Sequence, residues 1–87
     1  MSAYSFVVTK NAAKDIQKLS PILQKRLALK LKFYLNQSDP LASAKHLVGT
    51  QNGNFRWRIG DYRVVFDVDT DKIVILRVQH RREVYRD

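Results

Sequence analysis

Two runs of alternating residues, separated by a Gly-Asp pair, restrict the fold of this chain more than any other stretch. Residues 54 to 67 read NFRWRIGDYRVVFD, with arginine and bulky apolar residues alternating on both sides of Gly60 and Asp61. Alternation with a period of two is typical of a strand with one buried face, and Gly-Asp between two such runs predicts a two-residue hairpin turn. The chain should therefore contain an antiparallel strand pair whose register is set by its turn.

Counting outward from this turn predicts how the two strands pair. The expected pairs are Ile59 with Tyr62, Arg58 with Arg63, Trp57 with Val64, Arg56 with Val65 and Phe55 with Phe66. One face then carries the apolar side chains of Phe55, Trp57, Ile59, Tyr62, Val64 and Phe66. The other face carries Arg56, Arg58, Arg63, Val65 and Asp67. Because the apolar face must pack on the rest of the protein, we expect the arginines on an open face.

The pairing of Arg58 with Arg63 points to an anion as the missing partner. Like charges directly opposite each other destabilise a sheet, so a fold gains little from this pair, whereas a phosphate site gains two guanidinium groups. The alternative is that the long side chains splay apart in solvent and that Asp67 relieves part of their repulsion. If Asp69, Thr70 and Asp71 form the next loop, Arg77 falls opposite Arg63 and joins the site, although a slip of one residue would remove that alignment.

The remaining patterns predict the other elements of an α+β fold. Residues 4 to 9 alternate like a strand, and Thr9 can cap a short helix that reaches Leu19. Ser20 and Pro21 are typical of a helix start, and apolar residues then recur at spacings of three and four through Leu35. Residues 41 to 54 read as a connector, and 72 to 79 as a last strand. We predict one domain, 1–87, with the order β-α-α-β-β-β: two N-terminal helices packed on a mostly antiparallel four-stranded sheet.

The charge of the chain favours an anionic partner. The net charge is +8 and the 87 residues include no cysteine, which excludes disulfides and thiolate metal sites and fits a reducing compartment. The first residues do not have the pattern of a signal peptide, and no apolar run approaches the roughly 18 residues of a membrane span. A balance this basic usually indicates nucleic acid, with solubility as the alternative. The candidate contacts in the first part of the chain, which could equally be a solvated helix face, are Lys25, Arg26, Lys30, Lys32 and Lys45.

The C-terminal residues add candidate catalytic groups. The chain ends VQHRREVYRD, so His80, Arg81, Arg82 and Tyr85 follow the last predicted strand. Imidazole titrates near pH 6.5, so His80 could transfer protons, although a lone histidine is as often structural. Tyr85 could stack on a base, or transfer a proton if nearby arginines lower its pKa. The alternative is that these residues form a frayed, solvated end of the chain without a catalytic role.

The residue types present favour chemistry on RNA without a metal. The sequence has no paired-carboxylate cluster for two metals, no glycine-rich phosphate loop and no serine or cysteine nucleophile motif. RNA can be cut without them, because its own 2′-OH attacks the adjacent phosphate. A protein then needs to hold the strand in line, move protons and stabilise the negative charge of the pentavalent intermediate, which arginine does well.

Three segments together resemble the RelE/ParE superfamily of bacterial toxin–antitoxin systems, and RelE most closely. They are LVG at 47–49, FRWRIGDYRVVF at 55–66 and HRREVY at 80–85. The resemblance implies a cytoplasmic toxin that enters the A site of the 70S ribosome, beside the 16S rRNA, and cuts messenger RNA without a cofactor. It also implies a cognate antitoxin that blocks the toxin and through which the pair reaches operator DNA.

The resemblance also suggests roles for individual residues. Arg63 matches a phosphate-stabilising arginine after the turn, and Arg56 and Arg58 match two basic positions on the preceding strand. Tyr85 matches a C-terminal tyrosine linked to base stacking and proton transfer, and His80 and Arg81 cover a last basic position. The expected set for RNA or ribosome binding is Lys25, Arg26, Lys30, Lys32, Lys45, Arg77 and Arg82. Two alternatives remain: a ParE-like inhibitor of DNA gyrase without nuclease activity, and a non-catalytic RNA- or DNA-binding module.

Overall fold

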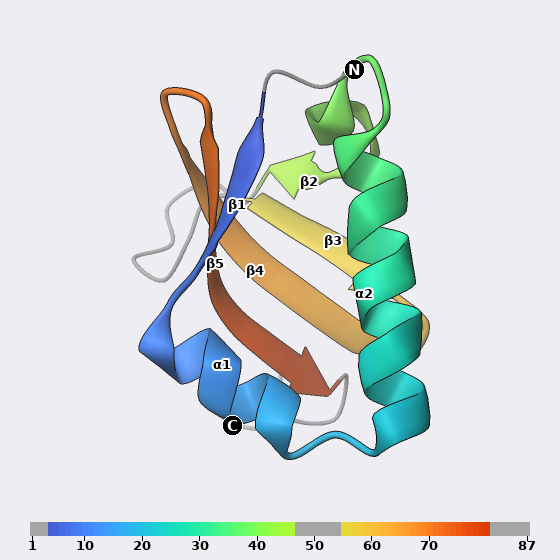
Figure 1. Cartoon of the computed structure of the whole chain (residues 1–87). Helices are drawn as coiled ribbons and strands as arrows, with labels where there is room; N and C mark the ends of the chain where they lie inside the picture. Colours follow the sequence, from blue (N-terminus) through green and yellow to red (C-terminus); the bar gives the residue numbers. More distant parts are fainter. Residues whose placement is uncertain (1–3, 47–54, 81–87) are drawn as a thin grey trace.

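The computed structural model describes residues 4–46 and 55–80, which form one sheet with two helices on the same side of it (Figure 1). The helices are α1 (Lys10–Gln17) and α2 (Pro21–Leu35), followed by a short 3₁₀ helix, η1 (Pro40–Ser43). The strands are β1 (Ser5–Val8), β2 (Lys45–His46), β3 (Phe55–Ile59), β4 (Tyr62–Asp69) and β5 (Lys72–His80). No helix within these ranges is both long and apolar enough to cross a membrane.

The sheet has the order β1-β5-β4-β3-β2, which makes β4 its central strand (Figure 1). β1 runs parallel to β5, and the other neighbours are antiparallel. The predicted α+β fold is therefore confirmed: two helices lie on a mostly antiparallel sheet whose four main strands follow the order β-α-α-β-β-β. The parallel pair arises because α1 and α2 carry the chain away from β1 before the antiparallel strands begin.

The predicted connector at 41–54 contains more structure than its sequence indicated. Part of η1 falls within it, and β2 pairs with the start of β3, with Lys45 opposite Arg56 and His46 opposite Phe55. A strand of two residues is too short to show alternation, and its pairing depends on a strand that comes later in the chain. Neither the alternation nor the pairing partner can be found within the segment itself.

Both helices begin at the residues predicted to cap them. The Thr9 Oγ1 accepts a hydrogen bond from the Ala12 N–H at 3.3 Å, and the Ser20 Oγ accepts one from the Leu23 N–H at the same distance. Pro21 occupies the first turn of α2, where its missing N–H costs nothing and its fixed φ suits the helix. Local capping chemistry therefore fixes where each helix starts.

The core lies between the helices and the sheet and is centred on Trp57, which has no exposed surface. Its ring stacks on Tyr34 of α2 with 4.7 Å between centroids, tilts against Phe66 at 4.1 Å, and meets the edge of Phe6 at 6.1 Å. Its indole N–H donates to the carbonyl of Pro40 at 3.3 Å, so the buried polar atom is satisfied. This packing joins β1, α2 and the β3–β4 hairpin and fixes the hairpin's orientation.

Candidate functional site

The β3–β4 hairpin has the predicted register throughout. Arg58 lies opposite Arg63, Trp57 opposite Val64 and Ile59 opposite Tyr62. Gly60 has a φ of +59°, a conformation that glycine adopts without the penalty that other residues pay, so the Gly-Asp turn can close the strands in two residues. The structure thus brings Arg58 and Arg63 together, with Arg56 on the same face opposite Val65.

The expectation of an open face holds for Arg58 but is wrong for Arg63. Arg58 is exposed and Arg56 is half-buried, whereas Arg63 has only 4% of its surface accessible and Val65 beside it only 9%. Arg63 lies on β4, the central strand of the sheet, between β3 and β5. A guanidinium covered this far has few rotamers to choose from, whereas the exposed side chain of Arg58 is less restricted.

The β4–β5 pairing differs from the predicted one. The turn consists of Thr70 and Asp71 alone, so Asp69 lies opposite Lys72, and a bulge between Val65 and Phe66 shifts the register again. Arg77 consequently lies opposite Val65, and Gln79 takes the place opposite Arg63. The predicted alignment of Arg77 with Arg63 is therefore wrong. Gln79 was missed because only the bulge, which leaves Leu76 without a pair, brings it to Arg63.

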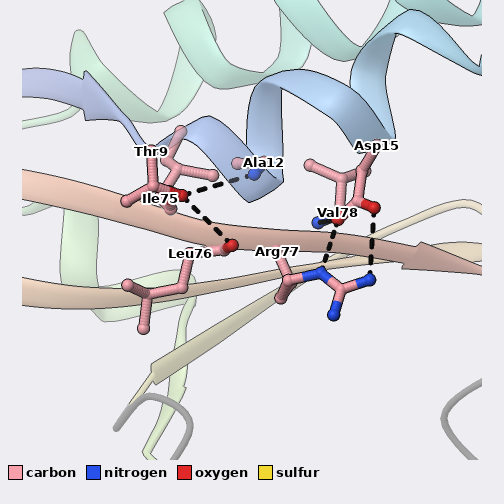
Figure 2. A network of polar contacts seen from close by, with 7 residues as sticks. All are labelled: Thr9, Ala12, Asp15, Ile75, Leu76, Arg77 and Val78. Carbon is pink, nitrogen blue, oxygen red and sulfur yellow. Dashed lines mark hydrogen bonds and ion pairs between the residues drawn. The ribbon is translucent and has the colours of Figure 1, made fainter.

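Arg77 instead joins β5 to helix α1 (Figure 2). Its guanidinium donates to both carboxylate oxygens of Asp15, at 2.8 and 3.2 Å, and the backbone N–H of Val78 donates to the same carboxylate at 2.9 Å. Thr9, just before α1, donates its hydroxyl to the carbonyl of Ile75 at 2.8 Å. These side-chain bonds hold the edge of β5 at the point where its backbone pairing with β1 ends, at Ile75.

Electrostatics around Asp15 favour its ionised form. Burial by itself would raise the pKa of the carboxyl, which is only 11% exposed. The hydrogen bonds from Arg77 and Val78, together with the positive charges of Arg77 and Lys18, outweigh burial and hold the pKa of Asp15 below its ordinary value. The ion pair therefore accounts for the charge of Arg77 within the protein, and an RNA contact would have to share its half-exposed guanidinium with Asp15.

His80 lies on the helix side of the sheet, away from the arginine face. It pairs with Tyr62, and the two rings meet edge to face at 5.0 Å between centroids. Tyr62 also pairs with Ile59 on the apolar face. His80 and Tyr62 line an open depression of about 550 Å³ together with Asp15 and Lys18. The structure does not bring His80 together with Arg58 and Arg63.

The basic residues of α2 lie near the hairpin. Lys25, Arg26, Lys30 and Lys32 are all exposed. Arg26 and Lys30 line, with Arg58, a shallow groove of about 590 Å³ between α2 and the β3–β4 turn. The ammonium group of Lys30 lies 4.9 Å from the ring centroid of Phe33 and 5.3 Å from that of Tyr34, within the range of a cation–π interaction.

Several predicted residues fall outside what the structure describes. Arg81, Arg82 and Tyr85 lie beyond residue 80, and the LVG segment at 47–49 lies in the undescribed part of the connector. Lys45 is described only through its backbone, opposite Arg56 in β2. Across 4–46 and 55–80, histidine, aspartate and glutamate side chains form no group of three that could hold a metal ion.

The chain is similar to known toxins in both sequence and fold. The model of the ParE toxin family of type II toxin–antitoxin systems matches residues 6–85. The chain belongs to the RelE/ParE superfamily of type II toxins. This toxin is 34% identical to Toxin RelG of Mycobacterium tuberculosis over 87 residues, covering 95% of this chain and 97% of the relative.

Two solved complexes share the fold of this toxin. A chain of the toxin–antitoxin complex RelBE2 from Mycobacterium tuberculosis matches with a TM-score of 0.73 and 32% identity, covering 90% of this chain and 98% of its own. A chain of the archaeal RelE–RelB complex from Pyrococcus horikoshii OT3 also matches with a TM-score of 0.73, at 25% identity, covering 98% and 99%. In both cases the solved structure is a complex of toxin and antitoxin.

Proposed function

We propose that this toxin is a ribosome-dependent endoribonuclease that cuts messenger RNA in the A site and so stops translation. The observation that carries the proposal is the pairing of Arg58 with Arg63 across β3 and β4. One guanidinium is exposed and the other is almost fully covered. Such a pair suits a phosphate that arrives from solvent and must then be held in one orientation.

The chemistry needs only the RNA and the side chains of the toxin. The 2′-oxygen attacks the adjacent phosphorus while its proton leaves to a base, and the bond to the 5′-oxygen breaks as that oxygen gains a proton. The products are a cyclic phosphate and a free 5′-hydroxyl. Negative charge on the non-bridging oxygens grows in the pentavalent intermediate, where Arg58 and Arg63 stabilise it more than in the starting diester. The carboxamide of Gln79, paired with Arg63 in the sheet, is a further candidate donor to these oxygens.

The roles of the remaining candidate residues, Tyr85, Arg81 and His80, are assigned as follows. Tyr85 and Arg81 keep the roles that the family resemblance suggests: base stacking or proton transfer for the tyrosine, and the last basic position of the site for the arginine. His80 lies on the other face of the sheet beside Tyr62, so we assign it to the support of the strand end rather than to the phosphate. Exposed cations such as Lys25 and Lys32 supply diffuse attraction to ribosomal RNA.

The partners and compartment follow from the same proposal. A ribosome-dependent nuclease acts in the cytoplasm, on messenger RNA held by the 70S ribosome. The solved relatives occur in complexes with an antitoxin, and we propose that this toxin has a cognate antitoxin that blocks it and carries the complex to operator DNA.

Incubation of the purified toxin with programmed ribosomes, followed by mapping of the messenger RNA ends, tests the proposal. Cuts in the A-site codon that appear only when ribosomes are present are expected. Folded toxin that leaves the message intact would refute the nuclease. The matching family model is that of ParE, so a DNA supercoiling assay on the same preparation tests the gyrase alternative, which predicts inhibition at low toxin concentration and no RNA product.

A further inference from the structure

Helix α2 has an apolar stripe on the side that faces away from the sheet. Leu27, Leu31 and Tyr34 are buried in the core. Ile22, Leu29 and Phe33 are instead 69%, 61% and 52% exposed. With 3.6 residues per turn, these three fall within about 40° of one another around the helix axis. They form an outer stripe, opposite the buried one.

Basic residues flank this outer stripe on both sides. On the same helical geometry Arg26 and Lys30 lie along one border of the stripe and Lys25 and Lys32 along the other. The 15 residues of α2 include no aspartate or glutamate. Arg26 and Lys30 are four residues apart, a spacing at which like charges destabilise a helix. The helix therefore exposes apolar surface between two rows of cations and has no carboxylate of its own to balance them.

The groove beside the stripe gives a partner side chain a place to enter. Leu29 and Phe33 of the stripe form one wall of the 590 Å³ groove, and Arg58, Ile59 and Gly60 form the other. An apolar side chain placed there would contact both α2 and the hairpin, while an acidic neighbour could reach Arg26, Lys30 or Arg58.

We propose that the outer face of α2, defined by Ile22, Arg26, Leu29, Lys30 and Phe33, binds an amphipathic, acidic helix of a protein partner. The inference rests on the proposed function in taking this partner to be the antitoxin. The partner helix places apolar side chains on the stripe and carboxylates along both borders, the arrangement by which helices in grooves are recognised. Exposed aliphatic groups add nothing to the binding of a phosphate backbone, which argues against RNA here. A second copy of this chain would bring like charges face to face, which argues against a homodimer.

Reversal of the border charges tests the electrostatic part of the proposal. The probe is the protein encoded by the reading frame next to the toxin's own gene, and its dissociation constant is measured by titration calorimetry. Arg26→Glu combined with Lys30→Glu should raise the constant at least about tenfold. Lys10→Glu combined with Lys14→Glu is the matched control, because it makes the same charge change at the same spacing on exposed positions of α1. The control should change the constant by no more than about twofold.

Removal of the apolar stripe tests the packing part. Leu29→Gln combined with Phe33→Gln should weaken the same complex at least about tenfold, while the circular dichroism spectrum and melting temperature stay close to those of the wild type, since both side chains are mostly exposed. Val8→Thr, at an apolar position of β1 that is 48% exposed, is the control and should bind normally.

The outcomes separate the two proposals. Wild-type toxin that binds the neighbouring protein while both α2 variants bind it equally well would overturn the docking surface and leave the toxin assignment standing. Wild-type toxin that does not bind it would overturn both. If the α2 variants lose ribosome binding but keep the protein partner, the surface belongs to RNA and the proposal is wrong.

Discussion

The carboxylate of Asp15 binds the guanidinium of Arg77 through two hydrogen bonds, at 2.8 and 3.2 Å, between helix α1 and strand β5. The same carboxylate accepts the Val78 N–H at 2.9 Å. The pairing of β1 with β5 ends before this point, because the chain turns from β1 into α1. A side chain of α1 therefore accepts the β5 backbone N–H that a neighbouring strand would otherwise bond. The end of β5, which carries Gln79 to its place opposite Arg63, is held by this contact.

Asp15→Asn should therefore destabilise the fold. The amide keeps the shape but removes the charge, and one of its two acceptor positions becomes a donor facing Arg77 or Val78. A hydrogen bond to a charged group contributes about 1.5–3 kcal/mol, and we expect a loss near the lower end because Arg77 is 43% exposed. Urea denaturation of both proteins measures it. Asp71→Asn is the control, since Asp71 and Lys72 are 4.0 Å apart and mostly exposed, and it should leave the free energy of unfolding almost unchanged.

The contribution of Asp15 should disappear in acid. The pKa of Asp15 is lower in the folded chain than in the unfolded one, where the pKa of an aspartate is about 3.9. The ionised carboxylate thus stabilises the fold above that pH, and the stabilisation is lost as the pH falls through the lower, folded value. The difference in unfolding free energy between wild type and Asp15→Asn should be constant from pH 7 to about 5 and shrink below about 4. A difference that stays constant down to the acid end would contradict this account.

Arg58 and Arg63 should respond differently to substitution. Arg58→Ala removes an exposed side chain, so cleavage of ribosome-bound messenger RNA should fall by about 10²–10³ with an unchanged melting temperature. Arg63→Ala should lose similar activity and also destabilise the fold by about 1–3 kcal/mol, because Arg63 is 4% exposed and its removal leaves a void. Single-turnover cleavage and thermal melting on the same samples separate the two effects. An Arg58→Ala toxin with full activity would contradict the phosphate site.

Thr70→Asn should stabilise the protein. Thr70 has a φ of +58° in the β4–β5 turn, a left-handed conformation that is costly for a β-branched residue and tolerated by asparagine. We expect a gain of about 1 kcal/mol, visible as a higher melting temperature. An unchanged or lower value would show that the contact of the Thr70 hydroxyl with Asp69, at 3.4 Å, offsets the backbone strain.

The sequence could predict those features that local chemistry decides. Gly60 and Asp61 close a hairpin in two residues, so counting from the turn is enough to pair Arg58 with Arg63. Thr9 and Ser20 cap helices through bonds to residues three positions on. Pairings that depend on distant residues could not be predicted in the same way. β2 pairs with residues later in the chain, and the two-residue turn and the bulge together place Gln79, rather than Arg77, opposite Arg63.

The site itself was predictable in its residues and less so in its environment. The alternation puts Arg56, Arg58 and Arg63 on one face, as observed, but it does not predict that Arg63 is almost fully covered. His80 was predicted as a catalytic group from the chemistry of imidazole and from the family resemblance, whereas its pairing with Tyr62 puts it on the face opposite the arginines. The outer apolar stripe of α2 was missed because the spacing of three and four marks only the buried side of the helix, and Ile22, Leu29 and Phe33 lie opposite it.

The stripe on α2 has a consequence for how the free toxin behaves in solution. The cations along its borders keep molecules apart, while Ile22, Leu29 and Phe33 would draw them together. At about 0.01 M salt the repulsion reaches some 30 Å, and at 1 M only about 3 Å. Added salt should therefore make the unbound toxin self-associate, the reverse of its effect on RNA binding, and an acidic partner helix should restore solubility by covering the stripe.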